Sequence, residues 1–261
     1  FDTGMIVPDY QTKDHFKGKT QTVNFDNELT FYKDFYTRFG VAYHKEEGSG
    51  NDRIKNSQNT KSIYLEQSFD FADRFYNTAG IRYDKNSKFG SKTTYRLTSR
   101  YNINEMLAVK GSFGTGFTTP TIYQLYVPVY GDKDLKPETS RGYDLGIELR
   151  PSSNSLISLN YFYTNYKNMI AGNSKNNYKY ENLNRAKIKG VEIAGSIALT
   201  DQLAVSASYT YLNAKQRSEG GKHEQMLRRP KHQITANVIY QPIQNLTLNA
   251  SAIYYSQRED A

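Results

Sequence analysis

The sequence has no cysteine, no tryptophan and only four methionines among its 261 residues. Without cysteine, a disulfide framework and a thiolate metal site are excluded, although the compartment is not determined. No stretch of 18 apolar residues occurs, so no transmembrane helix is expected. The patterns GxSxG, CxxC and the P-loop are also missing. A membrane β-barrel remains possible, because its strands turn only every second residue to lipid.

The composition is polar but rich in aromatic residues. Hydrophobic residues make up 37% and charged residues 23%, with a mean hydropathy of −0.75. The 23 tyrosines and 13 phenylalanines argue against disorder, because disordered chains are poor in aromatics. The net charge of +8 permits a nucleic-acid partner, a surface facing anionic lipid, or solvated loops. The cations form no dominant run, which favours solvated loops and a polar barrel interior over a nucleic-acid partner.

Alternation of apolar and polar residues predicts an all-β chain of twelve antiparallel strands from residue 23 onward. We interpret residues 1–19 as a loop. Short connections are predicted at residues 33–34, 72–73, 102–105, 151–153, 200–202 and 242–245. Polar loops are predicted at residues 44–60, 85–91, 172–184 and 215–230, together with a loop of about 23 residues before Tyr143. Strict alternation of short and long connections is typical of an up-and-down transmembrane barrel.

The predicted outward face carries an aliphatic band between two aromatic belts, as in membrane barrels. The belt near the short turns would contain Phe31, Phe35, Phe71, Phe75, Tyr101 and Tyr240. The belt near the long loops would contain Tyr43, Tyr83, Tyr95, Tyr143, Tyr163, Tyr211 and Tyr254. The predicted inward face is charged, with residues such as Arg38, Arg100 and Glu148. Two alternatives stay open at this point: a complete twelve-strand barrel acting as channel, autotransporter or hydrolase, and a soluble ligand-binding sandwich.

Four segments in the same order resemble the barrel of TonB-dependent outer-membrane receptors. They are GSFGTGFTTPTIYQLY at 111–126, GDKDLKPETSRGYDLGIE at 131–148, ENLNRAKIKGVEIAGS at 181–196 and MLRRPKHQ at 226–233. The likeness is greatest to the cobalamin receptors and the receptors for catecholate iron chelates. It covers about 150 residues, whereas the first hundred carry only the general hairpin pattern.

The resemblance implies a 22-strand barrel of the bacterial outer membrane with an N-terminal plug domain. Because the chain opens on Phe1 and ends in a charged stub, we expect residues 1–261 to be part of one such barrel domain, a fragment of about 12 strands without the plug and the last strands. The implied function is not enzymatic. It is uptake of a ferric siderophore or cobalamin, driven by a TonB-type protein that engages the absent N-terminal region. Outer-membrane lipid would be a further partner.

Candidate ligand-binding residues lie in two of these segments. Tyr123, Tyr126 and Tyr130 recur in the long loop, where they either stack on a flat ligand or pack the loop onto itself. Arg228 and Arg229 either contact an anionic ligand or a lipopolysaccharide phosphate, or pair with an acidic neighbour such as Glu224.

We expect no catalytic residue, metal ligand or cofactor. The four histidines, at positions 15, 44, 223 and 232, have no spacing typical of a metal site. In haem receptors of the resembled family a histidine lies between the proline segment and the L-x-P-E segment. Here that interval, residues 121–136, contains three tyrosines and no histidine, which favours an iron chelate or a corrinoid over His-ligated haem.

Overall fold

The computed structural model describes residues 15–32, 34–50, 54–173, 176–217, 221 and 224–259. Within them the chain forms one antiparallel sheet and one short helix. The elements are β1 (Phe16–Tyr32), β2 (Phe35–Gly50), β3 (Ile54–Phe71), β4 (Phe75–Asn86), β5 (Gly90–Asn102), β6 (Leu107–Thr118), α1 (Ile122–Tyr126), β7 (Glu138–Leu149), β8 (Ser155–Asn173), β9 (Lys179–Thr200), β10 (Leu203–Arg217), β11 (Glu224–Gln225), β12 (His232–Ile243) and β13 (Leu246–Tyr255).

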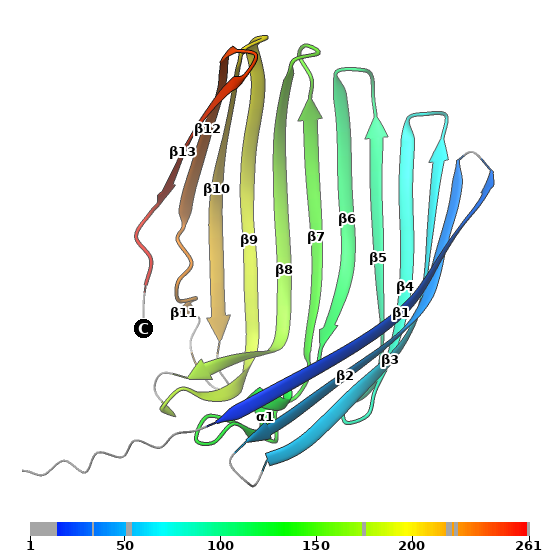
Figure 1. Cartoon of the computed structure of the whole chain (residues 1–261), viewed down its shortest axis with the longest axis vertical. Coiled ribbons are helices and arrows are strands. Elements are labelled where there is room, and N and C mark those ends of the chain that lie inside the picture. The colour runs from blue at the N-terminus through cyan, green and yellow to red at the C-terminus, as the bar shows by residue number, and fades with distance from the viewer. Residues whose placement is uncertain are drawn as a thin grey trace, which may run out of the picture.

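The sheet is an up-and-down meander in which each strand pairs with its neighbours in sequence (Figure 1). Its path runs from β1 to β10 and on through β12 to β13, and the two-residue β11 pairs only with β10. The prediction of twelve principal strands is therefore confirmed. In the part of the chain that the structure describes, β1 and β13 are the two edges and do not pair with each other. This geometry is an open section of a barrel wall, not a closed twelve-strand barrel and not a two-sheet sandwich.

The predicted inside-outside pattern is confirmed by the register. Phe25 faces Val41, Val41 faces Ile63, and Ile63 faces Tyr83, all with exposed or half-exposed side chains on one face of the sheet. Ladder hydrogen bonds satisfy the backbone, and these side chains contribute an apolar outer surface. A face of this kind is stable only when another apolar medium covers it.

Both aromatic belts are present on that outer face. Rings from adjacent strands touch, as in the pair Phe75 and Tyr101, whose ring centroids lie 6.2 Å apart, and the pair Tyr143 and Tyr163, whose centroids lie 5.1 Å apart. Such cross-strand aromatic pairs stabilise a sheet in addition to its hydrogen bonds. None of the helices in the described ranges has the length and apolar character needed to cross a membrane.

Several connections at the long-loop rim differ from the prediction. Residues 44–60 were predicted to form a polar loop, but the β2–β3 ladder continues to the pair Gly50 and Ile54. The predicted loop at 172–184 is likewise occupied by the ends of β8 and β9. The connection of β4 to β5 is a turn of three residues, so the strict alternation of short and long connections is wrong there. The β2–β3 and β8–β9 hairpins therefore extend the sheet at the long-loop rim.

The N-terminal prediction is also partly wrong. Strand β1 begins at Phe16 and pairs with the extended end of β2, so residues 16–19 are not a loop. The remainder of that predicted loop, residues 1–14, lies outside the described residues, as do Lys33 of one predicted turn and His223.

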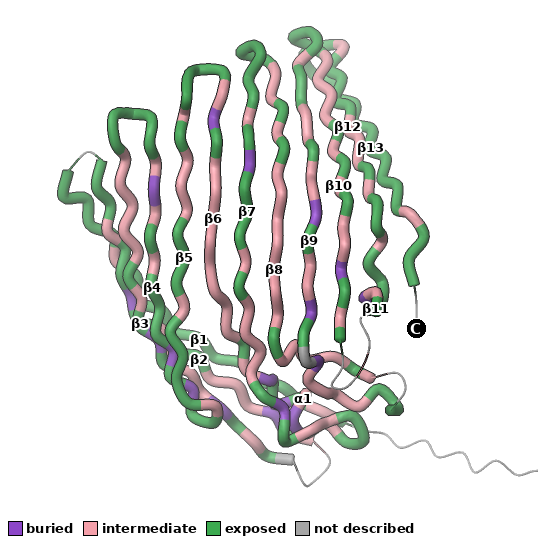
Figure 2. Tube along the Cα trace, turned by 180° about the vertical axis from the view of Figure 1, so that it is seen from behind, coloured by how far each residue is buried: buried purple, intermediate pink, exposed green. Residues whose placement is uncertain are grey.

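Buried apolar residues are few, and all of those described except Ala108, at the start of β6, lie toward the long-loop rim. Strands β1–β3 slant across the long-loop ends of β6–β9, with α1 between them (Figure 1). Buried segments accordingly surround α1 in the view from behind (Figure 2). The buried hydrophobic residues of the described chain are Ala108, Ile122, Leu125, Leu135, Leu183, Ala186, Ala214 and Met226. Within the described residues, Ala186, Ala214 and Met226 form one small cluster on β9–β11, and Ile122 and Leu125 are buried in α1.

Candidate functional site

The connection of β6 to β7, residues 119–137, folds inward over the sheet and carries α1. The helix begins with a capping box: the Thr121 hydroxyl accepts from the Gln124 backbone N–H at 3.1 Å, and the Gln124 side chain accepts from the Thr121 N–H at 2.9 Å. This arrangement satisfies two of the helix's free donors. The helix was not predicted, although the sequence Thr-Ile-Tyr-Gln contains the signature that would have revealed it.

One side of this loop is attached to β2 and β3. Glu46 accepts hydrogen bonds from the Ile122 N–H at 2.9 Å and from the Gln58 side chain at 2.8 Å. Gln58 also donates to the Pro120 carbonyl at 2.8 Å. Ile122 packs directly above Gly48, where a Cβ would collide with its side chain. A glycine at position 48 therefore allows the helix to lie close to the inner wall.

The other side of the loop is attached to the β8–β9 hairpin. The Tyr180 N–H donates to the Tyr130 carbonyl at 2.8 Å. Asn182 accepts from the Lys136 N–H at 2.7 Å and donates back to its carbonyl at 2.9 Å, while Lys179 lies 3.3 Å from a carboxylate oxygen of Asp132. Because the loop is fixed to β2–β3 on one side and to β8–β9 on the other, it spans the concave face at the long-loop rim. We call residues 119–137 the bridge, and the long-loop end of the sheet the mouth.

The three predicted tyrosines all lie in this bridge, but in different surroundings. Tyr123 packs edge-on against Phe16 at 4.9 Å and against Tyr180 at 6.3 Å between ring centroids. The Tyr126 hydroxyl accepts from the Lys88 ammonium at 3.0 Å. The same ring has Lys88 at 4.7 Å and Lys133 at 5.7 Å from its centroid.

Tyr130 and Tyr123 are both exposed, with 43% and 39% of their surfaces accessible, whereas Tyr126 is half-buried. Tyr123 thus contacts aromatic rings of two strands and stays partly accessible, Tyr126 lies against two lysines, and Tyr130 is exposed. Lys88 was not predicted as a site residue, because residues 85–91 were interpreted as a separate loop. A tight turn between β4 and β5 brings it to the tyrosines.

Arg228 and Arg229 lie at the same rim, next to β11, but they are not part of the bridge. Arg228 adopts a positive φ of 57°, and its N–H donates to the Glu259 carbonyl at 2.8 Å. The Arg229 guanidinium donates to the Arg228 carbonyl at 3.4 Å. The structure places this pair on the last hairpins of the sheet, so any ligand shared with the tyrosines must be large or must lie across the mouth.

The described histidines have structural partners. His44 lies 3.0 Å from the Thr22 hydroxyl, and His232 lies 2.9 Å from the Tyr209 hydroxyl. Among the residues that the structure describes, no group of three potential metal ligands converges.

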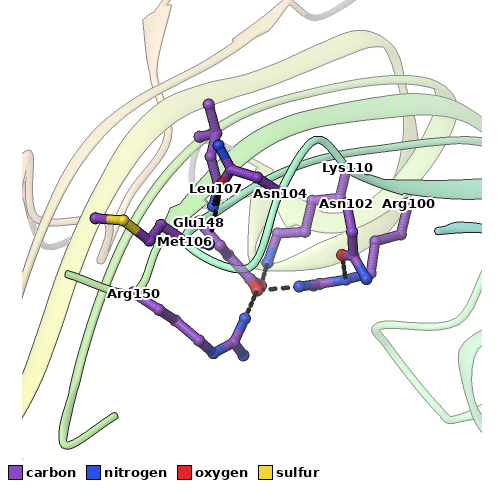
Figure 3. A network of polar contacts seen from close by, with 8 residues as sticks. All are labelled: Arg100, Asn102, Asn104, Met106, Leu107, Lys110, Glu148 and Arg150. Carbon is purple, nitrogen blue, oxygen red and sulfur yellow. Dashed lines mark hydrogen bonds and ion pairs between the residues drawn. The ribbon is translucent and has the colours of Figure 1, made fainter. Parts of the chain in front are cut away.

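The inner wall farther from the mouth is held by charge networks. The Glu148 carboxylate accepts hydrogen bonds from the Arg100 guanidinium at 2.7 Å and the Lys110 ammonium at 2.8 Å. The Arg150 guanidinium lies 3.7 Å from the same carboxylate, so three cations surround it (Figure 3). Next to it, the Ser112 hydroxyl donates to Asp144 at 2.6 Å. Of these residues, Arg100, Lys110, Ser112 and Asp144 border a hollow of about 540 Å³ on the inner face. The network fixes the strands' inner side chains and leaves a polar wall.

Comparisons with known proteins agree with this architecture. A family model described as "TonB dependent receptor-like, beta-barrel" matches residues 2–261. The vitamin B12 transporter BtuB of Photobacterium profundum is 29% identical over 245 residues, which are 90% of this chain and 37% of that protein. The iron-regulated outer membrane virulence protein of Vibrio cholerae is 28% identical over 230 residues, or 79% of this chain and 35% of that protein.

A solved structure gives the same fold. The ferric enterobactin receptor PfeA of Pseudomonas aeruginosa, in its G324V mutant form, superimposes with a TM-score of 0.80 at 20% identity. The likeness covers 94% of this chain and 42% of that one. The chain therefore spans between a third and a half of the length of these similar proteins.

Proposed function

Because the chain belongs to the TonB-dependent receptor β-barrel family, we propose that it supplies wall and mouth to a receptor that takes up an organic iron chelate or a corrinoid. The family consists of outer-membrane receptors and transporters, not enzymes. Residues 1–261 act as part of one barrel domain. Uptake is driven by a TonB-type protein that acts on a plug domain outside this chain. The names of two similar proteins, a vitamin B12 transporter and a ferric enterobactin receptor, support these two ligand classes.

The observation that carries the proposal is the basic, tyrosine-lined bridge across the mouth. The Tyr126 ring has both Lys88 and Lys133 within 6 Å of its centroid, and Tyr130, four residues further along the same loop, is exposed. Aromatic rings offer flat apolar faces with a polar tip, and lysines attract negative charge. An anionic catecholate complex satisfies both properties, while a corrinoid uses mainly the rings. Tyr123 acts indirectly, because it holds the bridge against Phe16 and Tyr180.

The test is calorimetric titration of the full-length receptor with ferric catecholate, cobalamin and haem. Replacing Tyr126 and Tyr130 by alanine should weaken binding of the cognate ligand roughly tenfold or more, since each stacked ring contributes about 0.5–1.5 kcal/mol beyond its buried area. Tyr178→Ala is the matched control, because Tyr178 is 57% exposed at the same rim. Haem binding that exceeds both other ligands and survives the double substitution would reject the proposal.

A second arm separates the two ligand classes by charge. Changing Arg228 and Arg229 to glutamine should weaken an anionic chelate by several-fold through lost electrostatic attraction, with little change for cobalamin. An equal loss for both ligands would indicate a folding defect of the last hairpins, which circular dichroism of the same preparations would reveal.

A further inference from the structure

The tip of the bridge, residues 128–130, has a backbone conformation that its sequence does not favour. The Tyr130 N–H donates to the Pro128 carbonyl at 2.8 Å, which closes a three-residue γ-turn around Val129. Val129 has a positive φ of 68°. This hand of the γ-turn is rare and strained, and a β-branched residue is poorly suited to it. The side chain gains little packing in return, because Val129 is 73% exposed.

Positive φ values elsewhere in the sheet have a local explanation that does not apply here. At Ala72 and Asp73 they belong to the turn between β3 and β4, in which the Arg74 N–H donates to the Phe71 carbonyl at 3.1 Å. Two successive residues with positive φ are the geometry that a tight hairpin turn prefers. Val129 lies in a long connection instead, so the contacts around it must impose its conformation.

Two contacts with the β8–β9 hairpin hold the tip in place. The Tyr180 N–H donates to the Tyr130 carbonyl at 2.8 Å. The Lys179 ammonium lies 3.3 Å from the Asp132 carboxylate, and both side chains are partly exposed. The net stabilisation from one hydrogen bond and one exposed ion pair is of the same order as the strain at one left-handed residue other than glycine. The attached and detached forms of the tip are therefore close in free energy.

The strained tip lies between two buried anchors. Leu125 in α1 and Leu135 near the end of the bridge are each 4% exposed. Beyond Leu135, the backbone of Lys136 exchanges hydrogen bonds in both directions with the Asn182 side chain. Between the anchors, residues 128–130, 133 and 134 are exposed. Both ends of the bridge are thus fixed, and the tip can detach from the hairpin without them.

We propose that residues 128–132 form a two-state latch on the β8–β9 side of the mouth. In the closed state Val129 has its strained positive φ, and the tip contacts Tyr180 and Lys179. In the open state Val129 has a negative φ and both contacts are broken, while Leu125 and Leu135 stay buried. An opening then forms between the bridge and the hairpin and gives a solute a route past the bridge. The latch does not depend on which ligand binds at the mouth.

The test is hydrogen exchange of the ligand-free, full-length receptor in lipid vesicles, with the Tyr180 amide as the reporter of the open state. Val129→Gly accepts a positive φ without strain, so this amide should exchange about fivefold more slowly than in wild type. Val129→Pro fixes φ near about −65° and forbids the closed turn, so exchange should accelerate about tenfold or more. In the described chain the Val129 N–H donates to no partner, so proline removes no hydrogen bond.

Val127→Gly is the matched control, because it makes the same change two residues earlier, where φ is −59°. It adds backbone freedom without relieving strain, so the Tyr180 amide should not be slowed. The Leu125 amide, which donates to the Thr121 carbonyl at 3.1 Å, should keep its wild-type rate in both Val129 variants. Unchanged or faster exchange of Tyr180 in Val129→Gly, or no acceleration in Val129→Pro, would overturn the proposal. Equal changes at Leu125 and Tyr180 would also overturn it, because the whole bridge would then move as one body.

Discussion

The wall and the mouth of this molecule place the same residue type in opposite surroundings. Ile63 on the outer wall has 58% of its surface exposed, whereas Ile122 in α1 has 1% exposed. Both are apolar and both lie in regular secondary structure, Ile63 in a strand ladder and Ile122 in a capped helix whose Ile122 N–H donates to Glu46. They differ in the medium that surrounds them.

In the wall, hydrogen-bonded ladders, cross-strand ring contacts and ion pairs on the inner face hold the strands together, and lipid covers the apolar side chains. At the mouth, water surrounds the loop, so the loop is stable only if its apolar residues form a core against β2, β3 and β9. The comparison shows that this chain needs a conventional core only where it leaves the membrane. Breaking each region should therefore have a different consequence.

The largest effect is expected at the mouth. Ile122→Ala removes a buried side chain and should destabilise the attached loop by about 2–5 kcal/mol, as for other large-to-small core substitutions. Hydrogen exchange of the 121–136 amides in lipid vesicles should accelerate accordingly, while the amides of β7 and β8 remain protected.

Ile63→Ala is the control for this change. Lipid tails refill the space that the missing methyl groups leave, and they are as apolar as the residues they replace. Its effect on unfolding should be much smaller. Equal effects of the two substitutions would show that the wall is also packed against protein and would contradict the comparison.

The next effect distinguishes the two faces of the wall. Val205 pairs with Ile197 and Val238 on the outer face, and Ser206 borders a hollow on the inner face. Val205→Arg should cost about 2–4 kcal/mol near the bilayer midplane, and Ser206→Arg much less. Urea titration in vesicles measures both. A similar cost at both positions would mean that neither face contacts lipid.

The wall could be predicted from sequence because lipid imposes a strict period of two on it. Residues such as Leu145, Ile147 and Leu149 must all point outward, whatever their partners. Beyond the tyrosine belt this constraint ends, since water covers both faces. Residues 44–60 have no apolar alternation and were therefore predicted to be a loop, although residues 44–50 and 54–60 form the ends of β2 and β3. Their pairing depends on the hairpin register already set within the membrane.

The position of the loop that carries α1 could not be predicted for a different reason. Its attachments, Gln58 to Pro120 and Glu46 to Ile122, join residues 62 and 76 positions apart. Sequence patterns report local periodicity and not contacts of this range. The tyrosines were found from their repetition alone, but whether each one packs or faces solvent depends on Phe16, Lys88 and Tyr180.

The smallest effect concerns the extended β1–β2 hairpin, which lies beyond the tyrosine belt. Lys45 lies 2.6 Å from Glu47, and this hydrogen bond and charge, with Lys19 and Lys55 farther away, lower the pKa of Glu47 from its ordinary value of 4.5. A carboxyl group with a lowered pKa stabilises the folded hairpin at pH values above its unfolded pKa. That contribution disappears as the pH falls through the folded value, so it is lost only below pH 4.5.

Because both side chains are about one-third exposed to water, the contribution of the pair to stability should be slight and sensitive to salt. A carbon-detected titration of labelled Glu47 in the full-length receptor should give a midpoint below the ordinary range. Lys45→Gln should raise that midpoint toward 4.5, whereas Lys61→Gln, on the next strand, should leave it unchanged. If Lys45→Gln left the Glu47 midpoint unchanged, the hairpin would not be held in this register above the membrane, and the wall would end at the tyrosine belt.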